Sequence, residues 1–213
     1  MAKTLWFLLK PALVIIGTLT LFYPVLLVFS LLTDGGTFFL TYLQGFFILY
    51  DIMLGICAAQ AISGYAPLAL SFGATRRSLR GAVLAFWVLL PLLCMVLDFA
   101  CNSFTARLFP LEANPFLIHL SAFPLQGLGL KFLLCGVMLW MGTLPFSALP
   151  IWKRALVILV VAVVYLQITV FMFVAKLIPA TILDVYSAGL GVISLVPTGV
   201  ALHRLKHFTI SRV

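Results

Sequence analysis

Charged residues are scarce in this sequence. Of its 213 residues only 8% are Asp, Glu, Lys or Arg, whereas 64% are hydrophobic. A water-soluble domain of this size needs a polar exterior, and so few charges do not cover one. The mean hydropathy of +1.25 leads to the same conclusion. The composition excludes an ordinary soluble domain and indicates a chain that lies in a membrane.

Groups for catalysis and metal binding are also few. The sequence has no Gly-x-x-x-x-Gly-Lys-Ser/Thr phosphate loop, so we expect no ATP site and no other cofactor in this chain. His119 lies on the opposite side of the expected membrane from His203 and His207. His203 and His207 have the helical spacing of metal ligands, but no third ligand accompanies them. The four cysteines lie in apolar segments, where we expect packing rather than disulfides. An intramembrane enzyme is therefore the function that the sequence supports least.

Hydrophobic runs fill nearly the whole sequence. A helix needs about 20 apolar residues to cross a bilayer, and six runs reach about that length. The first continues to Leu32 without a small-residue cleavage site, so we expect a retained span. We predict an all-α membrane protein with one transmembrane domain over residues 1–213. Its expected spans are residues 11–32, 38–62, 82–101, 125–149, 155–175 and 182–202.

Basic residues gather on alternate connections, which predicts the orientation of the chain. The side that we expect to be cytoplasmic holds ten of the 13 Lys and Arg residues and no loop carboxylate. Both termini then lie in the cytoplasm. The net charge of +8 reflects orientation and contact with anionic lipid rather than nucleic-acid binding. The ten residues are Lys3, Lys10, Arg76, Arg77, Arg80, Lys153, Arg154, Arg204, Lys206 and Arg212.

The connection between the second and third runs, residues 63–81, contains the most informative pattern. Pro67 suits the first turn of a short helix, and Gly73 suits its end, where a positive φ is needed. Thr75 is a good N-cap for the third span. We therefore predict a short apolar helix over about residues 65–72, on the cytoplasmic side.

Three arginines follow this short helix, at Arg76, Arg77 and Arg80. They stand at the beginning of a helix, where the macrodipole disfavours cations, so helix stability does not explain them. Two interpretations remain. The arginines anchor the loop to anionic lipid, or the apolar helix and its basic flank dock on a cytoplasmic partner.

The string Leu70-Ser-Phe-Gly-Ala-Thr-Arg-Arg-Ser-Leu-Arg-Gly81 resembles a stretch of small bacterial permease subunits of ABC-2-type transporters. There it lies between the second and third of six spans and forms a coupling helix. The resemblance implies an exporter in the bacterial plasma membrane, made of two permeases and two ATPase subunits that bind ATP and Mg²⁺. It implies contact with the ATPase through Tyr65, Leu68, Phe72, Gly73, Thr75, Arg76, Arg77 and Arg80.

A six-span uptake subunit of the vitamin-binding type has a similar length, and it stays open as a second function. Such a subunit requires small-residue motifs in its first span for contact with an energising module. The first span of this chain offers only Gly17 and scattered hydroxyls. The sequence therefore favours the exporter over the uptake subunit.

A few polar side chains fall inside the expected spans, where charge is costly and usually paired or functional. Asp98 and Lys131 lie at similar depth, which favours a structural ion pair. Asp51 has no evident partner at its own depth. With Tyr50 and Gln44 it marks a possible substrate pathway, and a protonated buried carboxyl is the alternative.

A stripe of small residues follows the second span. Gly55, Ala59 and Ser63 recur every four residues, so they lie on one face of the expected helix. Such a stripe permits close helix packing, either within the chain or across a dimer.

Overall fold

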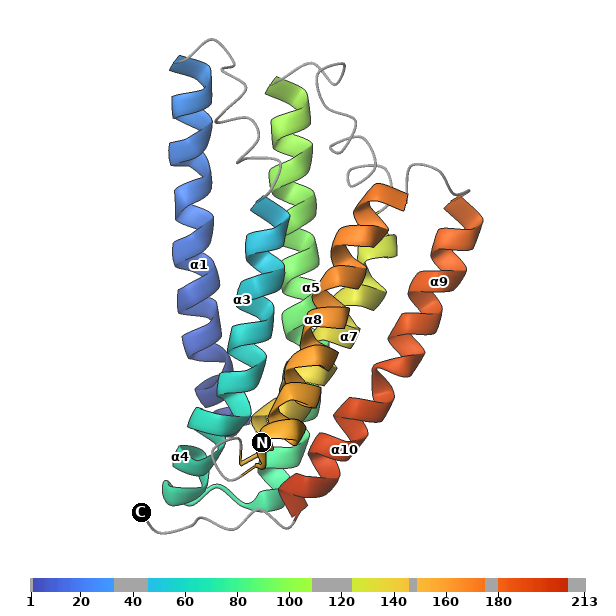
Figure 1. The fold of residues 1–213 in the computed structure, drawn as a ribbon. Coiled ribbons are helices and arrows are strands. Elements are labelled where there is room, and N and C mark those ends of the chain that lie inside the picture. Colours follow the sequence, from blue (N-terminus) through green and yellow to red (C-terminus); the bar gives the residue numbers. More distant parts are fainter. Residues whose placement is uncertain (1, 33–45, 109–123, 146–148, 175–179, 207–213) are drawn as a thin grey trace.

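The computed structural model describes residues 2–32, 46–108, 124–145, 149–174 and 180–206. The described part is all-helical and forms a bundle whose long helical rods alternate in direction along the chain (Figure 1). The elements are α1 (Ala2–Leu32), α3 (Phe46–Gln60), the π-helical turn η1 (Ala61–Tyr65), α4 (Ala66–Ser71), α5 (Arg76–Leu108), α7 (Pro124–Gly142), α8 (Ile151–Val174), α9 (Ala180–Ile193) and α10 (Leu195–Lys206).

Four helical segments of the described part are long and apolar enough to cross a membrane: Ala2–Leu32, Ile48–Ser71, Arg76–Thr105 and Thr181–Lys206. Gly127–Gly142 is a shorter apolar helix. Many large apolar side chains on α1, α8 and α9 are exposed, as expected of helices that face lipid. These features are compatible with a multi-pass membrane protein. The six spans and the cytoplasmic placement of both ends stay predictions.

Several helix boundaries differ from those expected. The first helix begins at Ala2, before its expected span starts at residue 11. The third begins at Arg76, directly after the predicted Thr75 cap and before its expected span starts at residue 82. The fourth ends at Gly142, well before residue 149, and the fifth begins at Ile151 instead of residue 155. Residues 143–150 contain Pro145 and Pro150, and proline favours a helix start rather than an interior position. The start of the second expected span, at residue 38, lies outside the described residues.

The last rod, Thr181–Lys206, is interrupted at Ser194 between α9 and α10. Pro197 lacks an N–H, and its ring would clash with the carbonyl of Ile193 in a regular helix. α9 therefore ends at Ile193 and α10 begins at Leu195. The Ser194 hydroxyl donates to the Gly191 carbonyl at 2.5 Å and so satisfies one of the carbonyls at the end of α9.

A similar argument explains the π-helical turn before α4. Pro67 would clash with the carbonyl of Ser63, four residues earlier, in a regular helix. The wider π turn over Ala61–Tyr65 avoids this clash, and the chain continues into α4 without a break. The second rod thus extends past residue 62, where the expected span ended, to Ser71.

α7 is the central helix, because it packs against α3, α5, α8, α9 and α10. Its glycines permit this closeness. A Cβ at Gly129 would lie 1.9 Å from the carbonyl oxygen of Ser187, and one at Gly142 would lie 2.6 Å from that of Ala59. Gly136 faces α10 in the same way. Glycine therefore lets α9, α10 and α3 approach α7 more closely than any other residue would.

The small-residue stripe of α3 packs within the chain. A Cβ at Gly55 would meet the Tyr165 hydroxyl at 2.6 Å and the Met138 side chain at 3.4 Å. The Ala59 carbonyl lies against Gly142 of α7. Ser63 is exposed, and its hydroxyl donates to that same carbonyl at 2.9 Å. The contacts of Gly55 and Ala59 thus support packing within the chain rather than across a dimer.

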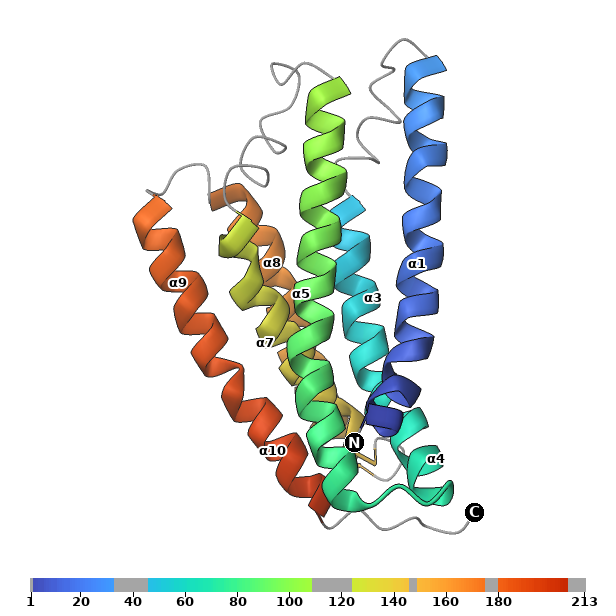
Figure 2. The ribbon, with the colours of Figure 1, turned by 180° about the vertical axis from the view of Figure 1, so that it is seen from behind.

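One end of the bundle collects most of the described basic residues. α1, α5 and α8 begin there, and α10 ends there, beside α4 (Figures 1 and 2). The described basic residues in those segments are Lys3, Lys10, Arg76, Arg77, Arg80, Lys153, Arg154, Arg204 and Lys206. We call this the basic end. Trp6 and Trp152 are exposed in the same segments, a placement typical of a membrane–water interface.

Candidate functional site

The predicted short helix is present, with the ends that its sequence indicates. Pro67 lies in the first turn of α4. At its other end the Gly73 N–H donates to the Leu70 carbonyl at 3.1 Å and the Ala74 N–H donates to the Ala69 carbonyl at 2.9 Å. This is a Schellman motif, which needs a left-handed residue, and Gly73 has φ 86°. The predicted short helix and its end at Gly73 are confirmed, whereas its cytoplasmic location stays a prediction.

α5 begins directly after this turn. The Ser78 N–H donates to the Thr75 hydroxyl at 3.2 Å, so Thr75 is the N-cap of α5, as predicted. Two residues, Gly73 and Ala74, separate Phe72, the C-cap of α4, from this N-cap of α5. Because both ends are fixed by hydrogen bonds, α4 has little freedom to move independently of α5.

The outer surface of α4 is apolar and exposed. Phe72 is 77% exposed and Leu68 is 47% exposed. They are four residues apart and therefore lie on one face of the helix. Tyr65 is half-buried, with its ring edge-on to Phe7 at a centroid distance of 6.1 Å. Leu68 and Phe72 thus form a small apolar surface at the basic end.

The three arginines of the connection are exposed beside this surface. Arg76, Arg77 and Arg80 all lie in the first turns of α5. Within the described ranges, both ion pairs of the structure involve Lys131, so no described carboxylate neutralises these arginines. The surface therefore presents uncompensated positive charge next to exposed apolar side chains.

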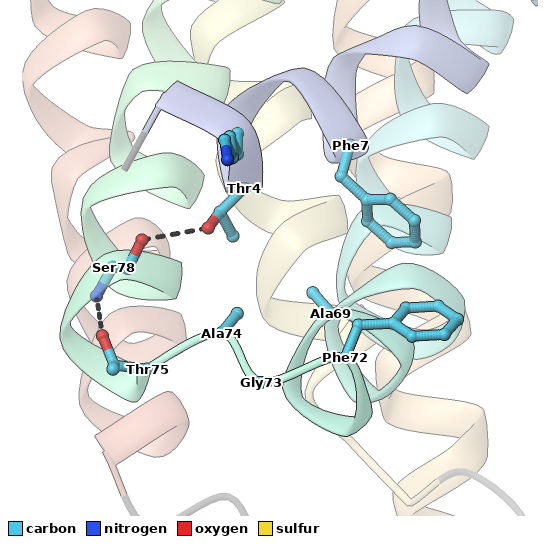
Figure 3. Close-up of a pocket in the computed structure, with 9 residues that line it drawn as sticks. Thr4, Phe7, Ala69, Phe72, Gly73, Ala74, Thr75 and Ser78 are labelled. Carbon is cyan, nitrogen blue, oxygen red and sulfur yellow. Dashed lines mark hydrogen bonds between the residues drawn. The ribbon is translucent and has the colours of Figure 1, made fainter.

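A groove of about 500 Å³ runs between the first turns of α1, the end of α4 and the start of α5 (Figure 3). On one side the Phe7 and Phe72 rings lie edge to face, with centroids 6.0 Å apart. On the other side the Thr4 and Ser78 hydroxyls are 3.0 Å apart. Lys3 also lines the groove.

Lys3, Thr4 and Phe7 belong to the site, although the sequence indicates residues 1–10 only as a lead-in to the first span. No local pattern marks these three residues. They reach the site because α1 packs against α4, η1 and α5, and this contact depends on tertiary structure.

Asp51 has a partner, which corrects the expectation that it has none. The Lys131 ammonium on α7 lies 2.5 Å from Asp51 Oδ1 on α3. It also contacts Asp98 Oδ2 on α5, the pair that was expected from depth alone. The expectation for Asp51 was wrong because the depth of each side chain was judged from its position in the sequence. In the structure α3 packs directly against α7, and this contact brings Asp51 to Lys131.

Tyr50 is fully buried and does not face an open cavity. Its hydroxyl is 2.8 Å from Thr20 Oγ1 on α1 and 3.8 Å from Cys101 Sγ on α5. Tyr23 makes a similar connection, because its hydroxyl donates to the Cys101 carbonyl at 2.7 Å. These tyrosines hold α1, α3 and α5 together. Gln44, the third residue of the expected substrate pathway, lies outside the described residues.

Comparison with known proteins gives no identification. No family model, no curated protein and no solved structure matches this chain. Its function is therefore inferred from its own residues.

Proposed function

We propose that this chain is the permease subunit of an ATP-driven ABC exporter, and that α4 with the start of α5 docks on a separate ATPase subunit. The observation that carries the proposal is that exposed Leu68 and Phe72 lie beside three exposed arginines that form no ion pair with a described carboxylate. Exposed apolar side chains with a charged flank are typical of protein interfaces, where apolar anchors supply affinity and charges supply orientation.

The connections of α4 support this role. α4 is continuous with α3 through η1, and it is joined to α5 by the Schellman turn and the Thr75 cap. A force on α4 therefore acts on α3 and α5 together. Those two helices carry Asp51 and Asp98, which Lys131 joins to α7. A movement of the ATPase partner would thereby be transmitted through α4, α3 and α5 to the centre of the bundle.

The positive charge of the basic end supports a cytoplasmic location for α4, because Lys and Arg are retained on that side of a membrane. ATP and Mg²⁺ would bind to the ATPase chains. Two permeases, identical or related, would form the pathway, and alternating access would move an amphipathic or hydrophobic peptide, drug or lipid-like molecule. The resemblance of residues 70–81 to ABC-2-type permeases supports this assembly in a bacterial plasma membrane.

A pull-down of the tagged chain from native membranes in mild detergent tests this proposal. We expect the wild-type chain to recover an ATPase subunit, and we expect Arg76→Glu/Arg77→Glu to lower that recovery at least about tenfold. Charge reversal at the docking surface would repel the acidic partner surface, and about 1.4 kcal/mol suffices for a tenfold change.

Arg204→Glu/Lys206→Glu is the matched control, because it reverses two exposed charges of α10 at the same end. This variant should retain the ATPase. Equal recovery by both double variants, or no ATPase with the wild-type chain, would contradict the proposal.

A further inference from the structure

Lys131 lies between two carboxylates in the centre of the bundle. Its ammonium is 2.5 Å from Asp51 Oδ1 and also contacts Asp98 Oδ2. The exposed fractions of Asp51, Lys131 and Asp98 are 6%, 6% and 8%. If both carboxylates were ionised, this triad would carry one net negative charge between apolar helices. An uncompensated charge in such a place costs several kcal/mol.

One atom of the triad lacks a partner. Asp98 Oδ1 is buried and has no hydrogen bond to any described residue. Among the described residues, the titratable groups around the triad do not supply a second cation, because they are tyrosines and cysteines, whose side chains form no cation. Tyr50 on α3, Cys94 and Cys101 on α5 and Tyr165 on α8 interact with members of the triad, and Cys57 and Cys135 interact with Cys94.

A metal ion does not suit this position. Within the described residues no cluster of three or more His, Cys, Asp or Glu side chains offers a metal site. A metal cation would also stand next to the Lys131 ammonium and be repelled by it. A proton needs only one oxygen atom, and one oxygen is unpartnered.

We propose that the triad binds one proton, on the Asp98 carboxyl, so that the remaining Asp51–Lys131 pair is electrically neutral. Release of this proton adds a negative charge at the point where α3, α5 and α7 meet. The packing of these three helices is thereby linked to proton binding. The inference rests on the triad alone and does not require the ATPase partner.

Infrared spectroscopy of the purified full-length chain near neutral pH, in maltoside detergent micelles that contain no carbonyl group, tests the proposal. A protonated carboxyl has a C=O stretch at higher frequency than the amide band, and a carboxylate does not. We expect this band in the wild-type chain and its loss in Asp98→Asn. Asp184→Asn, which changes an exposed aspartate of α9, should keep the band. A wild-type spectrum without the band, or a band that persists in Asp98→Asn, would overturn the proposal.

A second variant keeps the test decisive if Asp98→Asn does not fold. The chain has only five acidic residues, so Asp34→Asn/Glu112→Gln/Asp184→Asn leaves Asp51 and Asp98 as its only acidic side chains. We expect the band to remain in this variant. Its disappearance would assign the protonated carboxyl to a residue outside the triad and reject the proposal.

Discussion

Lys131→Met should lower the free energy of unfolding by about 3 to 5 kcal/mol, the range measured when one partner of a buried ion pair is removed. Methionine has a similar length and fills the same space, so the loss reports on charge rather than on a cavity. Without the ammonium, Asp51 and Asp98 remain buried beside each other with no cation in contact. Equilibrium unfolding in mixed detergent micelles measures the change.

Two controls separate the charge from other effects. Lys153→Met removes an exposed lysine near the Trp152 ring and should change the free energy of unfolding by less than about 0.5 kcal/mol. Adding Asp51→Asn and Asp98→Asn to Lys131→Met removes both carboxyl groups that lost their cation and should restore most of the lost stability. If Lys131→Met alone cost less than about 1 kcal/mol, the triad would not stabilise the bundle.

Gly129→Ala should lower the free energy of unfolding by about 1 to 3 kcal/mol, the usual cost of overpacking a core, because it disturbs the contact between α7 and α9. The new Cβ would lie 1.9 Å from the Ser187 carbonyl oxygen and 2.7 Å from its carbonyl carbon. These are backbone atoms, so α9 itself has to shift. The shift would also disturb the hydrogen bond that the Gly129 N–H donates to Ser187 Oγ at 3.1 Å.

Gly127→Ala is a matched control on the same helix, two residues away. A Cβ there meets nothing within 4 Å. Because alanine favours a helix by about 1 kcal/mol over glycine, this variant should be neutral or stabilising. The two substitutions are therefore expected to have opposite signs in the same unfolding measurement. Equal stability of the two variants would show that α9 does not pack closely on α7 at Gly129.

The features predicted correctly from sequence are those with local causes. The short helix at α4 depends on Pro67, on the positive φ of Gly73 and on the Thr75 cap, all within one connection. Hydrophobic runs likewise indicate helices that can cross a membrane. The boundaries were less accurate, because the end of the fourth span was judged from hydropathy, although Pro145 lies inside the expected span and disfavours a helix interior.

The triad and the groove could not be predicted in full, because both depend on which helices are neighbours. Asp98 and Lys131 were paired from depth, but Asp51 was left without a partner because sequence position does not show that α3 packs on α7. Gly142 permits that packing, but nothing near it in the sequence shows that it lies against the backbone of α3. The same holds for Phe7, which reaches Phe72 only after α1 has packed against α4.

Site-specific photo-crosslinking in living cells tests most directly whether α4 docks on an ATPase. A photoreactive amino acid would replace Leu68 on the exposed face of α4, and Leu108, exposed at the far end of α5, would serve as the control position. The proposed function predicts that the probe at position 68 forms a covalent adduct with a chain that contains an ATP-binding phosphate loop, and that the probe at position 108 does not. Adducts at position 68 that contain only lipid, or only a second copy of this chain, would contradict it.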